Sequence, residues 1–294
     1  MNRRTFIGTS IAATVAAARP AWPAAAHHIA PIGLQLYTVR ELMKTDFDGT
    51  IAKVAQVGYK EVEFAGYFGK TPQEVRATLE KNSHAAPSAH FGYDVVEQKW
   101  SETLDTAHTI GHKFVVCPWI DVKQRAEPDG WKRAAELFNR AGEAAQKAGI
   151  QFAYHNHAFE FEPSEVLSGK LPYDFLLENT DPKLVKMELD LCWITVGGQD
   201  PAKYFGRYPG RFPLVHVKDW TTKGPGGNDY GGATGGSKKT GHITDVGQGD
   251  IDWKRIFAQS EKAGIQHYIV ENDEPKSPFD DIKVSLDYLA KLTV

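Results

Sequence analysis

The sequence has little cysteine, no long apolar run and no excess of charge of one sign. Its 294 residues include only two cysteines, too few for a disulfide framework. No apolar run reaches the roughly 18 residues of a membrane-spanning helix, so we expect a mature chain that is not embedded in a membrane. The formal net charge of -3 argues against a duplex nucleic-acid partner, because such proteins present a basic face.

Several catalytic signatures are missing too. There is no CxxC, HExxH, P-loop or GxSxG motif, so the enzyme classes that these motifs define are unsupported. The turn after the first predicted strand reads Thr38-Val39-Arg40 and lacks the glycines of a dinucleotide-binding turn. That absence disfavours an open, doubly wound sheet.

Residues 1–26 are typical of an export signal rather than of a folded domain. Arg3 and Arg4 form a basic pair before an Ala-rich stretch, which ends in the small residues 24–26. This succession defines a secretory signal, and the arginine pair resembles the bacterial twin-arginine type. An ordinary secretion signal is the alternative. We expect a periplasmic or secreted protein whose fold begins near His27.

Eight short apolar, β-branched segments alternate with helical patterns along the rest of the chain. The predicted strands are residues 32–37, 61–64, 87–90, 114–117, 151–157, 185–190, 214–218 and 267–271. A helix-ending glycine directly before a strand recurs in VGYKEVEF, AGIQFAYH and AGIQHYIV, and it marks the joint of a βα unit. Eight such units in the roughly 268 remaining residues predict a single (β/α)8 TIM barrel over residues 27–294.

Helix boundaries can also be predicted. We expect Asp48 to cap a helix over residues 50–57. Thr71 and Glu74 should form a capping box around a helix that opens at Pro72. Further helices are predicted over residues 131–148, 253–263 and 279–292.

Residues 224–249 depart from the βα pattern, because they include ten glycines. They follow the seventh predicted strand, on the side where barrel enzymes have their active sites. A loop of this length inside a compact domain is usually a functional lid or a disordered insertion. A lid would be cut by proteases near Lys238 and Lys239, and substrate would protect it.

Polar side chains collect at the C-terminal ends of the predicted strands. They are Gln35, Tyr37, Glu63, His90, Cys117, His155, His157, Glu188, Asp190, His216, Lys218 and Glu271. A buried charge is costly unless it is paired or bound to metal, so their gathering on one rim predicts a functional site. Aspartate, histidine and glutamate together suit Mn²⁺, Mg²⁺, Co²⁺ or Zn²⁺.

On these residues the chain resembles the xylose-isomerase-like TIM barrels, in the broad family of sugar phosphate isomerases and epimerases. The phrases that carry the likeness are IGLQLYTVR, GYKEVEFAG, FAYHNHAFEF, MELDLCW, LVHVKDW, DVGQGDIDW and IVENDEP. The resemblance implies one divalent metal ion, with Asp190, His216 and Glu271 as ligands. Glu160 is our choice for the first ligand, and His155 or His157 is the alternative.

The resemblance also suggests roles in catalysis. It implies abstraction of a proton next to a carbonyl through a metal-stabilised enediolate. Glu160 and Glu271 could each serve as ligand and base, and His157 and Lys218 as proton donors. Lys218 could instead form a plain ion pair with Asp219. The expected substrate-binding residues are Glu63, His90, His155, Trp119 and Trp193, although the two tryptophans could also be packing residues.

Export points to an unphosphorylated substrate, since sugar phosphates are mostly cytoplasmic. We therefore expect an isomerase or epimerase of an unphosphorylated sugar or keto-sugar. A β-eliminating lyase or hydratase of 3-keto-glycosides is the second hypothesis, and a non-catalytic carbohydrate-binding barrel is the third. A related abasic-site endonuclease type uses a cluster of metals with more ligands, and the mildly acidic charge disfavours it. The metal, the stereochemical course and the oligomeric state stay open.

Overall fold

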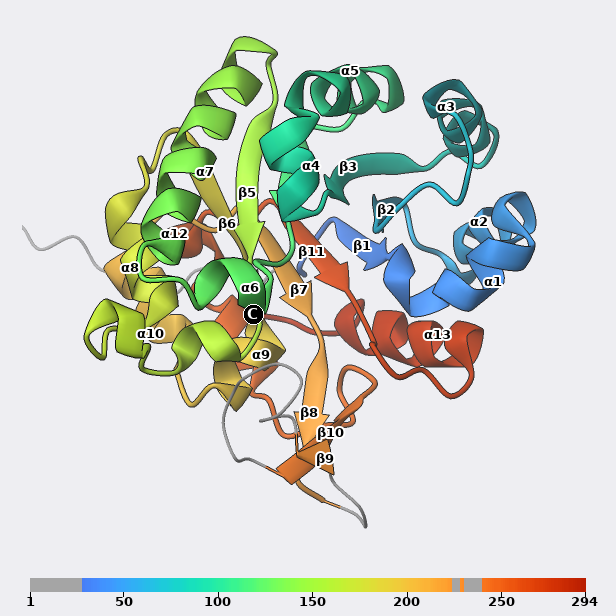
Figure 1. The fold of residues 1–294 in the computed structure, drawn as a ribbon. Helices are drawn as coiled ribbons and strands as arrows, with labels where there is room; N and C mark the ends of the chain where they lie inside the picture. The colour runs from blue at the N-terminus through green and yellow to red at the C-terminus, as the bar shows by residue number, and fades with distance from the viewer. Residues whose placement is uncertain (1–27, 224–227, 230–239) are drawn as a thin grey trace, which may run out of the picture.

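The computed structural model describes residues 28–223, 228–229 and 240–294. Eight parallel strands close into a barrel in the order β1-β11-β7-β6-β5-β4-β3-β2, and helices surround it (Figure 1). The predicted (β/α)8 fold is therefore confirmed. The expected export signal, and Lys238 and Lys239, lie outside the described residues.

The barrel strands match the eight predicted segments. They are β1 (Ile32–Gln35), β2 (Glu61–Phe64), β3 (Ala85–His90), β4 (Phe114–Cys117), β5 (Gln151–His155), β6 (Val185–Asp190), β7 (Leu214–Val217) and β11 (His267–Val270). Strands β1, β5, β7 and β11 end one or two residues earlier than predicted. His157, Lys218 and Glu271 thus lie just beyond strand ends, on the rim of the barrel.

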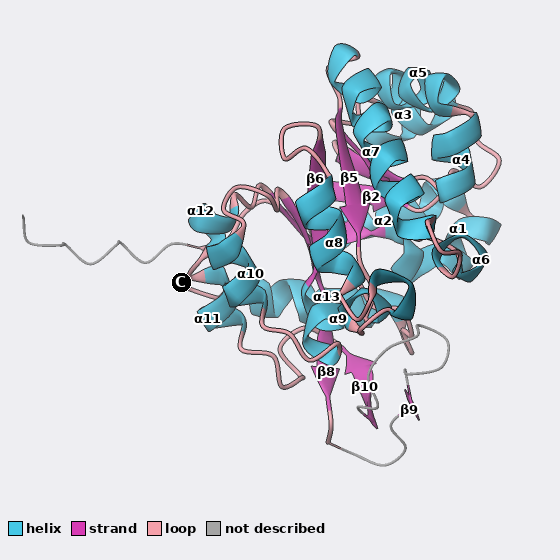
Figure 2. Ribbon diagram, turned by 60° about the vertical axis from the view of Figure 1, so that its left-hand side comes forward, coloured by secondary structure: helices cyan, strands magenta, loops and turns pink. Residues whose placement is uncertain are grey.

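Thirteen α-helices occur in the described residues, and most pack outside the strands (Figure 2). They are α1 (Arg40–Thr45), α2 (Phe47–Val57), α3 (Pro72–Lys81), α4 (Tyr93–Gln98), α5 (Trp100–Ile110), α6 (Val122–Arg125), α7 (Gly130–Lys147), α8 (Pro172–Asn179), α9 (Leu191–Val196), α10 (Pro201–Arg207), α11 (Trp253–Phe257), α12 (Ser260–Ala263) and α13 (Pro278–Leu289). None of these helices is long and apolar enough to cross a bilayer.

Two helix predictions need correction. Asp46, not Asp48, caps α2, because its carboxylate accepts the Gly49 N–H at 2.9 Å. The predicted helix over residues 253–263 is interrupted, and α11 and α12 are separate. The capping box of Thr71 and Glu74 is confirmed.

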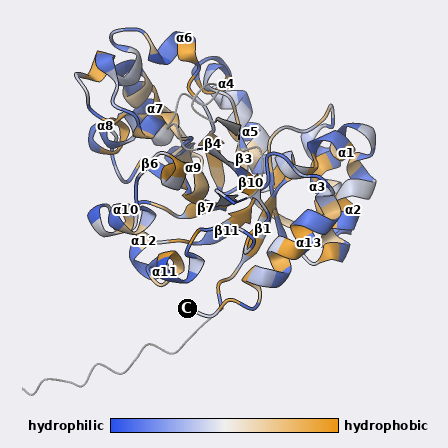
Figure 3. Cartoon of the chain, turned by 90° about the horizontal axis from the view of Figure 1, so that it is seen from below, coloured by the Kyte–Doolittle hydropathy of each residue, from blue (hydrophilic) through white to orange (hydrophobic). Residues whose placement is uncertain are grey.

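The barrel interior has an apolar floor. Phe114, Val116, Ala153, Leu214 and Ile269 form one buried cluster from four strands. Alternate residues of a strand point to the same side, so the inward positions beyond this floor are those nearest the strand ends. The outer helices show hydrophilic and hydrophobic faces (Figure 3), as expected where one side packs on the strands. The polar residues of the interior therefore lie at the C-terminal end.

A small antiparallel sheet extends from this end (Figures 1 and 2). It has the order β8 (Asp219–Thr221), β10 (Thr240–Thr244) and β9 (Asn228–Asp229). Part of the glycine-rich segment is thus ordered as strands rather than as loop. Whether this segment closes over the site as a lid is a prediction that stays untested, because residues 224–227 and 230–239 lie outside the description.

Asp219 anchors residues 247–251, where the chain comes back to the barrel after β10. Its buried carboxylate accepts hydrogen bonds from the backbone N–H groups of Gly247 at 2.9 Å, Gly249 at 3.2 Å and Ile251 at 3.3 Å. It also accepts one from the Trp253 indole at 2.9 Å. Because these donors satisfy Asp219, the alternative of an ion pair with Lys218 is not realised.

We expect Asp219→Ala to lower the free energy of unfolding by at least about 2 kcal/mol, because each buried donor left without a partner costs about 1–3 kcal/mol. Urea unfolding measures this. Asp252→Ala is the control, because Asp252 caps α11 through the Arg255 N–H and its loss should cost only about 1 kcal/mol. Equal losses in the two variants would contradict a special role for Asp219.

Candidate active site

A cavity of about 690 Å³ opens at the C-terminal end of the barrel. Seven of the predicted site residues line it: His90, Trp119, His155, His157, Trp193, Lys218 and Glu271. Tyr37, Arg40, Ile243 and Asp273 also belong to its wall. The structure thus brings together residues that the sequence separates by more than 180 positions, from His90 to Glu271.

Asp190, His216 and Glu271 form what we call the rim group. One potential ligand atom of each lies within 4.8 Å of those of the other two. The His216 Nδ1 atom is 2.9 Å from Glu271 Oε2. Asp190 and His216 are fully buried, and Glu271 is 6% exposed. These three predicted metal ligands therefore converge, as the resemblance implied, and whether they bind an ion is a prediction.

Lys218 lies among the carboxylates of the rim. Its buried ammonium is 3.2 Å from Asp190 Oδ2, 2.9 Å from Glu271 Oε2 and 2.7 Å from Asp273 Oδ2. Burial acts to raise the pKa of Glu271, but Lys218 and His216 outweigh it and hold that pKa below its usual range. Three carboxylates therefore face one ammonium, and the remaining negative charge matches a divalent cation.

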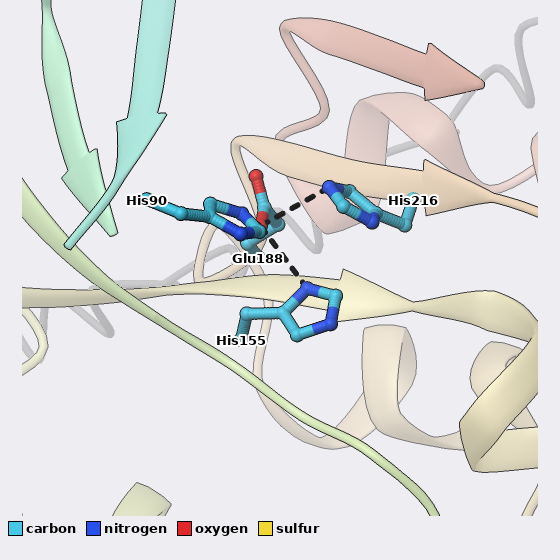
Figure 4. A group of neighbouring side chains, drawn as sticks. All are labelled: His90, His155, Glu188 and His216. Carbon is cyan, nitrogen blue, oxygen red and sulfur yellow. Dashed lines mark hydrogen bonds and ion pairs between the residues drawn. The ribbon is translucent and has the colours of Figure 1, made fainter. Parts of the chain in front are cut away.

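A second cluster, the deep group, lies below the rim. It consists of His90, His155, Glu188 and His216, with the three rings around the Glu188 carboxylate (Figure 4). Glu188 Oε2 is 2.7 Å from His90 Nε2, 3.1 Å from His155 Nδ1 and 3.3 Å from His216 Nε2. The two groups share His216, whose ring nitrogens face opposite ways.

The negative charge of the carboxylates at the deep group is offset by protons on its own side chains. Burial acts to lower the pKa of His90, but Glu63 and Glu188 outweigh it and raise that pKa to about 10. Burial, reinforced by Glu63, raises the pKa of Glu188 to about 7. A metal ion in either group would have to displace a histidine proton, that of His90 in the deep group or that of His216 in the rim group. The rim group is the better candidate for a divalent ion because it offers two carboxylates, whereas the deep group offers one.

Glu63 does not lie where sugar binding would require it. Its side chain is fully buried and is not part of the cavity wall. Its Oε1 atom instead contacts Gln35 Nε2 at 2.7 Å and His216 Nε2 at 2.8 Å. The structure corrects the expected substrate contact, because the rings of His90 and His216 lie between this carboxylate and the rim.

Glu160, the expected first ligand, is turned away from both groups. Its two oxygens accept hydrogen bonds from the Tyr154 hydroxyl at 2.6 Å and from the His157 N–H at 2.8 Å. It is fully buried, and burial raises its pKa to about 7. Residues 159–161 form a short 3-10 turn after β5, and this turn directs the carboxylate into the wall rather than into the cavity. The placement does not support Glu160 as ligand or base.

We expect Glu160→Gln to keep the metal content of the protein unchanged, because both oxygens of Glu160 serve the wall. Metal analysis of the purified variant measures this. Glu271→Gln is the matched comparison, since it makes the same chemical change inside the rim group and should lower metal content. Equal loss of metal in both variants would restore Glu160 as the first ligand.

His157 faces the cavity with a neutral ring. Burial, reinforced by Lys218, lowers its pKa to about 3, so it is unsuited to be a charged acid near neutral pH. Its Nδ1 atom is buried and has no hydrogen-bond partner among the described residues. Trp119 packs edge-on against this ring, with centroids 4.7 Å apart. Because Nδ1 is closed off, a substrate oxygen could meet this neutral ring only at Nε2.

The two tryptophans both line the cavity but differ in surroundings. Trp119 is partly exposed, which leaves a face for a sugar ring. Trp193 is 3% exposed, and the Lys218 ammonium lies 5.1 Å from its ring centroid. Trp193 therefore packs chiefly on the protein side of the wall, and Trp119 is the better stacking candidate.

Sequence reasoning gave no role to Glu188 or Asp273. Glu188 precedes Asp190 by two residues on β6, so strand periodicity placed both on the inner face without showing which one reaches the rim. Asp273 follows the end of β11 in the phrase IVENDEP, and its contact with Lys218 depends on the loop conformation. Burial raises the pKa of Asp273 to about 6, against the opposing effect of Lys218.

Comparisons with known proteins identify the family of the chain. Residues 51–292 match the family described as xylose isomerase-like TIM barrel, and the chain belongs to this family. Inosose dehydratase of Lacticaseibacillus casei is 27% identical over 288 residues, which cover 89% of this chain and 95% of the dehydratase. The chain is an enzyme of the xylose-isomerase-like superfamily, either a sugar isomerase or epimerase or a lyase.

Solved structures give the same picture. A sugar phosphate isomerase/epimerase from Parabacteroides distasonis ATCC 8503 has a TM-score of 0.72 and 26% identity, over 88% of this chain and 93% of the other. The IOLI protein, which was solved with a binding zinc atom, has a TM-score of 0.65 and 14% identity, over 88% of this chain and 98% of the other. The second likeness shows a shared fold.

Proposed function

We propose that this enzyme is a divalent-metal-dependent lyase that eliminates a β-oxygen from an uncharged cyclic keto-sugar or keto-glycoside. The similarity to an inosose dehydratase over nearly the whole chain supports a dehydratase type of reaction. The observation that carries the proposal is the placement of the acidic groups. Glu271 and Asp273, which both line the cavity, pair with Lys218, while Glu160 points away from the cavity.

The rim group fits the proposed ion. Asp190, His216 and Glu271 offer two carboxylates and one imidazole, a donor set that suits Mn²⁺, Mg²⁺, Co²⁺ or Zn²⁺. Asp190 Oδ2 is buried and has no hydrogen-bond partner among the described residues, only the ion pair with Lys218. When bound, a divalent ion would supply a Lewis acid for the oxygens of a keto-sugar.

The chain's own residues would act on a ketone held in this cavity. A carboxylate beside Lys218 takes the proton from the carbon next to the carbonyl, and Asp273, with a pKa raised to about 6, is a stronger base than Glu271, whose pKa is lowered. The Lys218 ammonium stabilises the negative charge that develops on the carbonyl oxygen. The electron pair of the broken C–H bond forms a C=C bond as the C–O bond at the β-carbon breaks. The leaving oxygen takes up a proton and departs as water or an alcohol.

This arrangement favours elimination over epimerisation. Epimerisation by two bases requires a proton acceptor on each face of the reacting carbon. Besides the acidic groups, the described wall offers Trp119 and the neutral rings of His155 and His157. His157 can donate a hydrogen bond to a leaving oxygen, but its low pKa makes it a weak base.

The cavity wall also favours an uncharged substrate. Arg40 and Lys218 are the arginine and lysine among the described lining residues. Arg40 donates to the Tyr37 carbonyl at 2.8 Å and the Asp273 carbonyl at 3.1 Å, and Lys218 is paired with carboxylates. The acidic groups of Glu271 and Asp273 would repel a phosphate. Sugar phosphates are thus poor candidates for this site.

Incubation of metal-loaded protein in D₂O with inososes, keto-sugars and 3-keto-glycosides tests the proposal. Elimination should release water or an alcohol and give an unsaturated ketone, detected by ultraviolet absorbance and mass spectrometry. Deuterium uptake with the carbon skeleton and its oxygens intact would identify an isomerase or epimerase instead. Binding without any exchange of a C–H bond would indicate a carbohydrate-binding barrel.

We expect His216→Ala to lose metal affinity by more than about 100-fold, beyond the effect of an outer-shell change, and to lose turnover with it. The barrel should stay folded, because its floor is packed by other side chains. Metal titration and circular dichroism measure the two effects. His108→Ala, an exposed change on α5, should behave as the unchanged protein. Full metal binding by His216→Ala would refute the rim site.

We further propose that residues 1–26 direct export by the twin-arginine route. Replacement of Arg3 and Arg4 by lysine keeps the positive charge but removes the arginine pair. The variant should accumulate inside bacterial cells, as fractionation and immunoblotting would show, while the unchanged chain reaches the periplasm. Normal export of the lysine variant would point to the general secretion route, which tolerates either residue.

A further inference from the structure

We propose that Glu63 is a positioning residue that holds the His216 ring so that Nδ1, not Nε2, faces the metal. This inference rests on the proposed function, because it concerns the same ion. The His216 Nε2 atom is 2.8 Å from Glu63 Oε1, and the Nδ1 atom on the other side of the ring is 2.9 Å from Glu271 Oε2. Glu63 and His216 are both fully buried, so the contact between them is shielded from bulk solvent.

The direction of these contacts determines the tautomer. A histidine that binds a metal through Nδ1 must carry its proton on Nε2, and Glu63 Oε1 lies in position to accept that proton as a hydrogen bond. Such a carboxylate contact orients the ring and makes the ligating nitrogen more basic. The Glu63 carboxylate thus gives His216 the tautomer and orientation that the rim group requires.

Glu63 is itself held in place. Gln35 Nε2 donates to Glu63 Oε1 at 2.7 Å, and the Gln35 amide oxygen accepts the Tyr37 N–H at 3.1 Å. His90 Nε2 lies 3.0 Å from the same carboxylate oxygen. Contacts from β1, β3 and β7 therefore converge on Glu63 Oε1. A chain of hydrogen bonds runs from the 3-10 helix Leu36–Val39, which follows β1, through Gln35 and Glu63 to His216.

The test measures metal affinity directly, by competition between the apoprotein and a chelator for Co²⁺. Glu63→Gln keeps the shape of the side chain and removes its charge. We expect it to weaken Co²⁺ binding by about 10- to 100-fold and to shift the visible absorption of the bound Co²⁺, because the imidazole becomes a weaker and less ordered ligand. The temperature of apoprotein unfolding should change little by comparison.

Glu61→Gln is the matched control. Glu61 precedes Glu63 by two residues on β2, and its Oε2 atom is 2.7 Å from His267 Nδ1. The same glutamate–histidine contact therefore exists at the opposite end of the same strand, away from the rim. Glu61→Gln should leave both Co²⁺ affinity and the absorption spectrum unchanged.

Gln35→Met serves as a second variant should Glu63→Gln not fold. It keeps the Glu63 charge but removes the donor that anchors it, so Co²⁺ binding should weaken by a smaller factor. Native affinity and spectrum in both Glu63→Gln and Gln35→Met would overturn the inference while leaving the rim site intact, provided that His216→Ala loses the ion. Loss of Co²⁺ from Glu188→Gln but not from Glu271→Gln would place the ion in the deep group and overturn the inference as well.

Discussion

The structure of the site depends on one buried imidazole between two layers of carboxylates. His216 is fully buried, and it faces Glu63 through one ring nitrogen and Glu271 through the other. Burial acts to lower the pKa of His216, but Glu188 and Glu271 outweigh it and raise that pKa above its usual value. Without a metal ion at the rim, His216 is therefore protonated, and its charge is stabilised by the neighbouring carboxylates. A metal ion on Nδ1 would take over that role, so protonation and metal binding compete at a single atom.

Strand periodicity explains why the charges form layers. Inward positions recur every second residue, so Leu214, His216 and Lys218 follow one another up the inside of the barrel along β7. The first belongs to the apolar floor, the second joins the two groups, and the third reaches the rim. The neighbouring strand β11 repeats this order, with Ile269 on the strand and Glu271 just past its end. The apolar floor raises the free-energy cost of burying an unpaired charge above it. The charged side chains above the floor are therefore stable only when they are paired.

This regularity is also the reason that the sequence predicted much of the fold and part of the site. Short apolar, β-branched segments located all eight strands, and the strand-end rule gathered the polar residues of the rim. The family resemblance then selected Asp190, His216 and Glu271 among them as ligands. The strand-end rule could not determine the direction of residues in irregular segments. Glu160 lies five positions past the end of β5, near enough to be a ligand, and a single 3-10 turn directs it into the wall. Similarly, two aspartates lay within reach of the α2 terminus, and only the backbone geometry selected Asp46.

The orientation of Glu160, away from the cavity and into the wall, affects the possible reaction as well as the number of metal ligands. A mechanism that uses Glu160 and Glu271 as two bases would need both carboxylates in the cavity. Glu160 instead accepts hydrogen bonds from the Tyr154 hydroxyl and the His157 N–H within the wall. That same contact fixes the rim loop on which the His157 ring stands. The hydrogen bond that keeps the Glu160 carboxylate out of the cavity therefore also holds the backbone of His157, whose neutral ring lines the cavity. The cavity wall therefore combines the carboxylates that pair with Lys218 and the neutral ring of His157. A wall that offers both a carboxylate base and a neutral hydrogen-bond donor suits a reaction in which the substrate loses a proton and an oxygen.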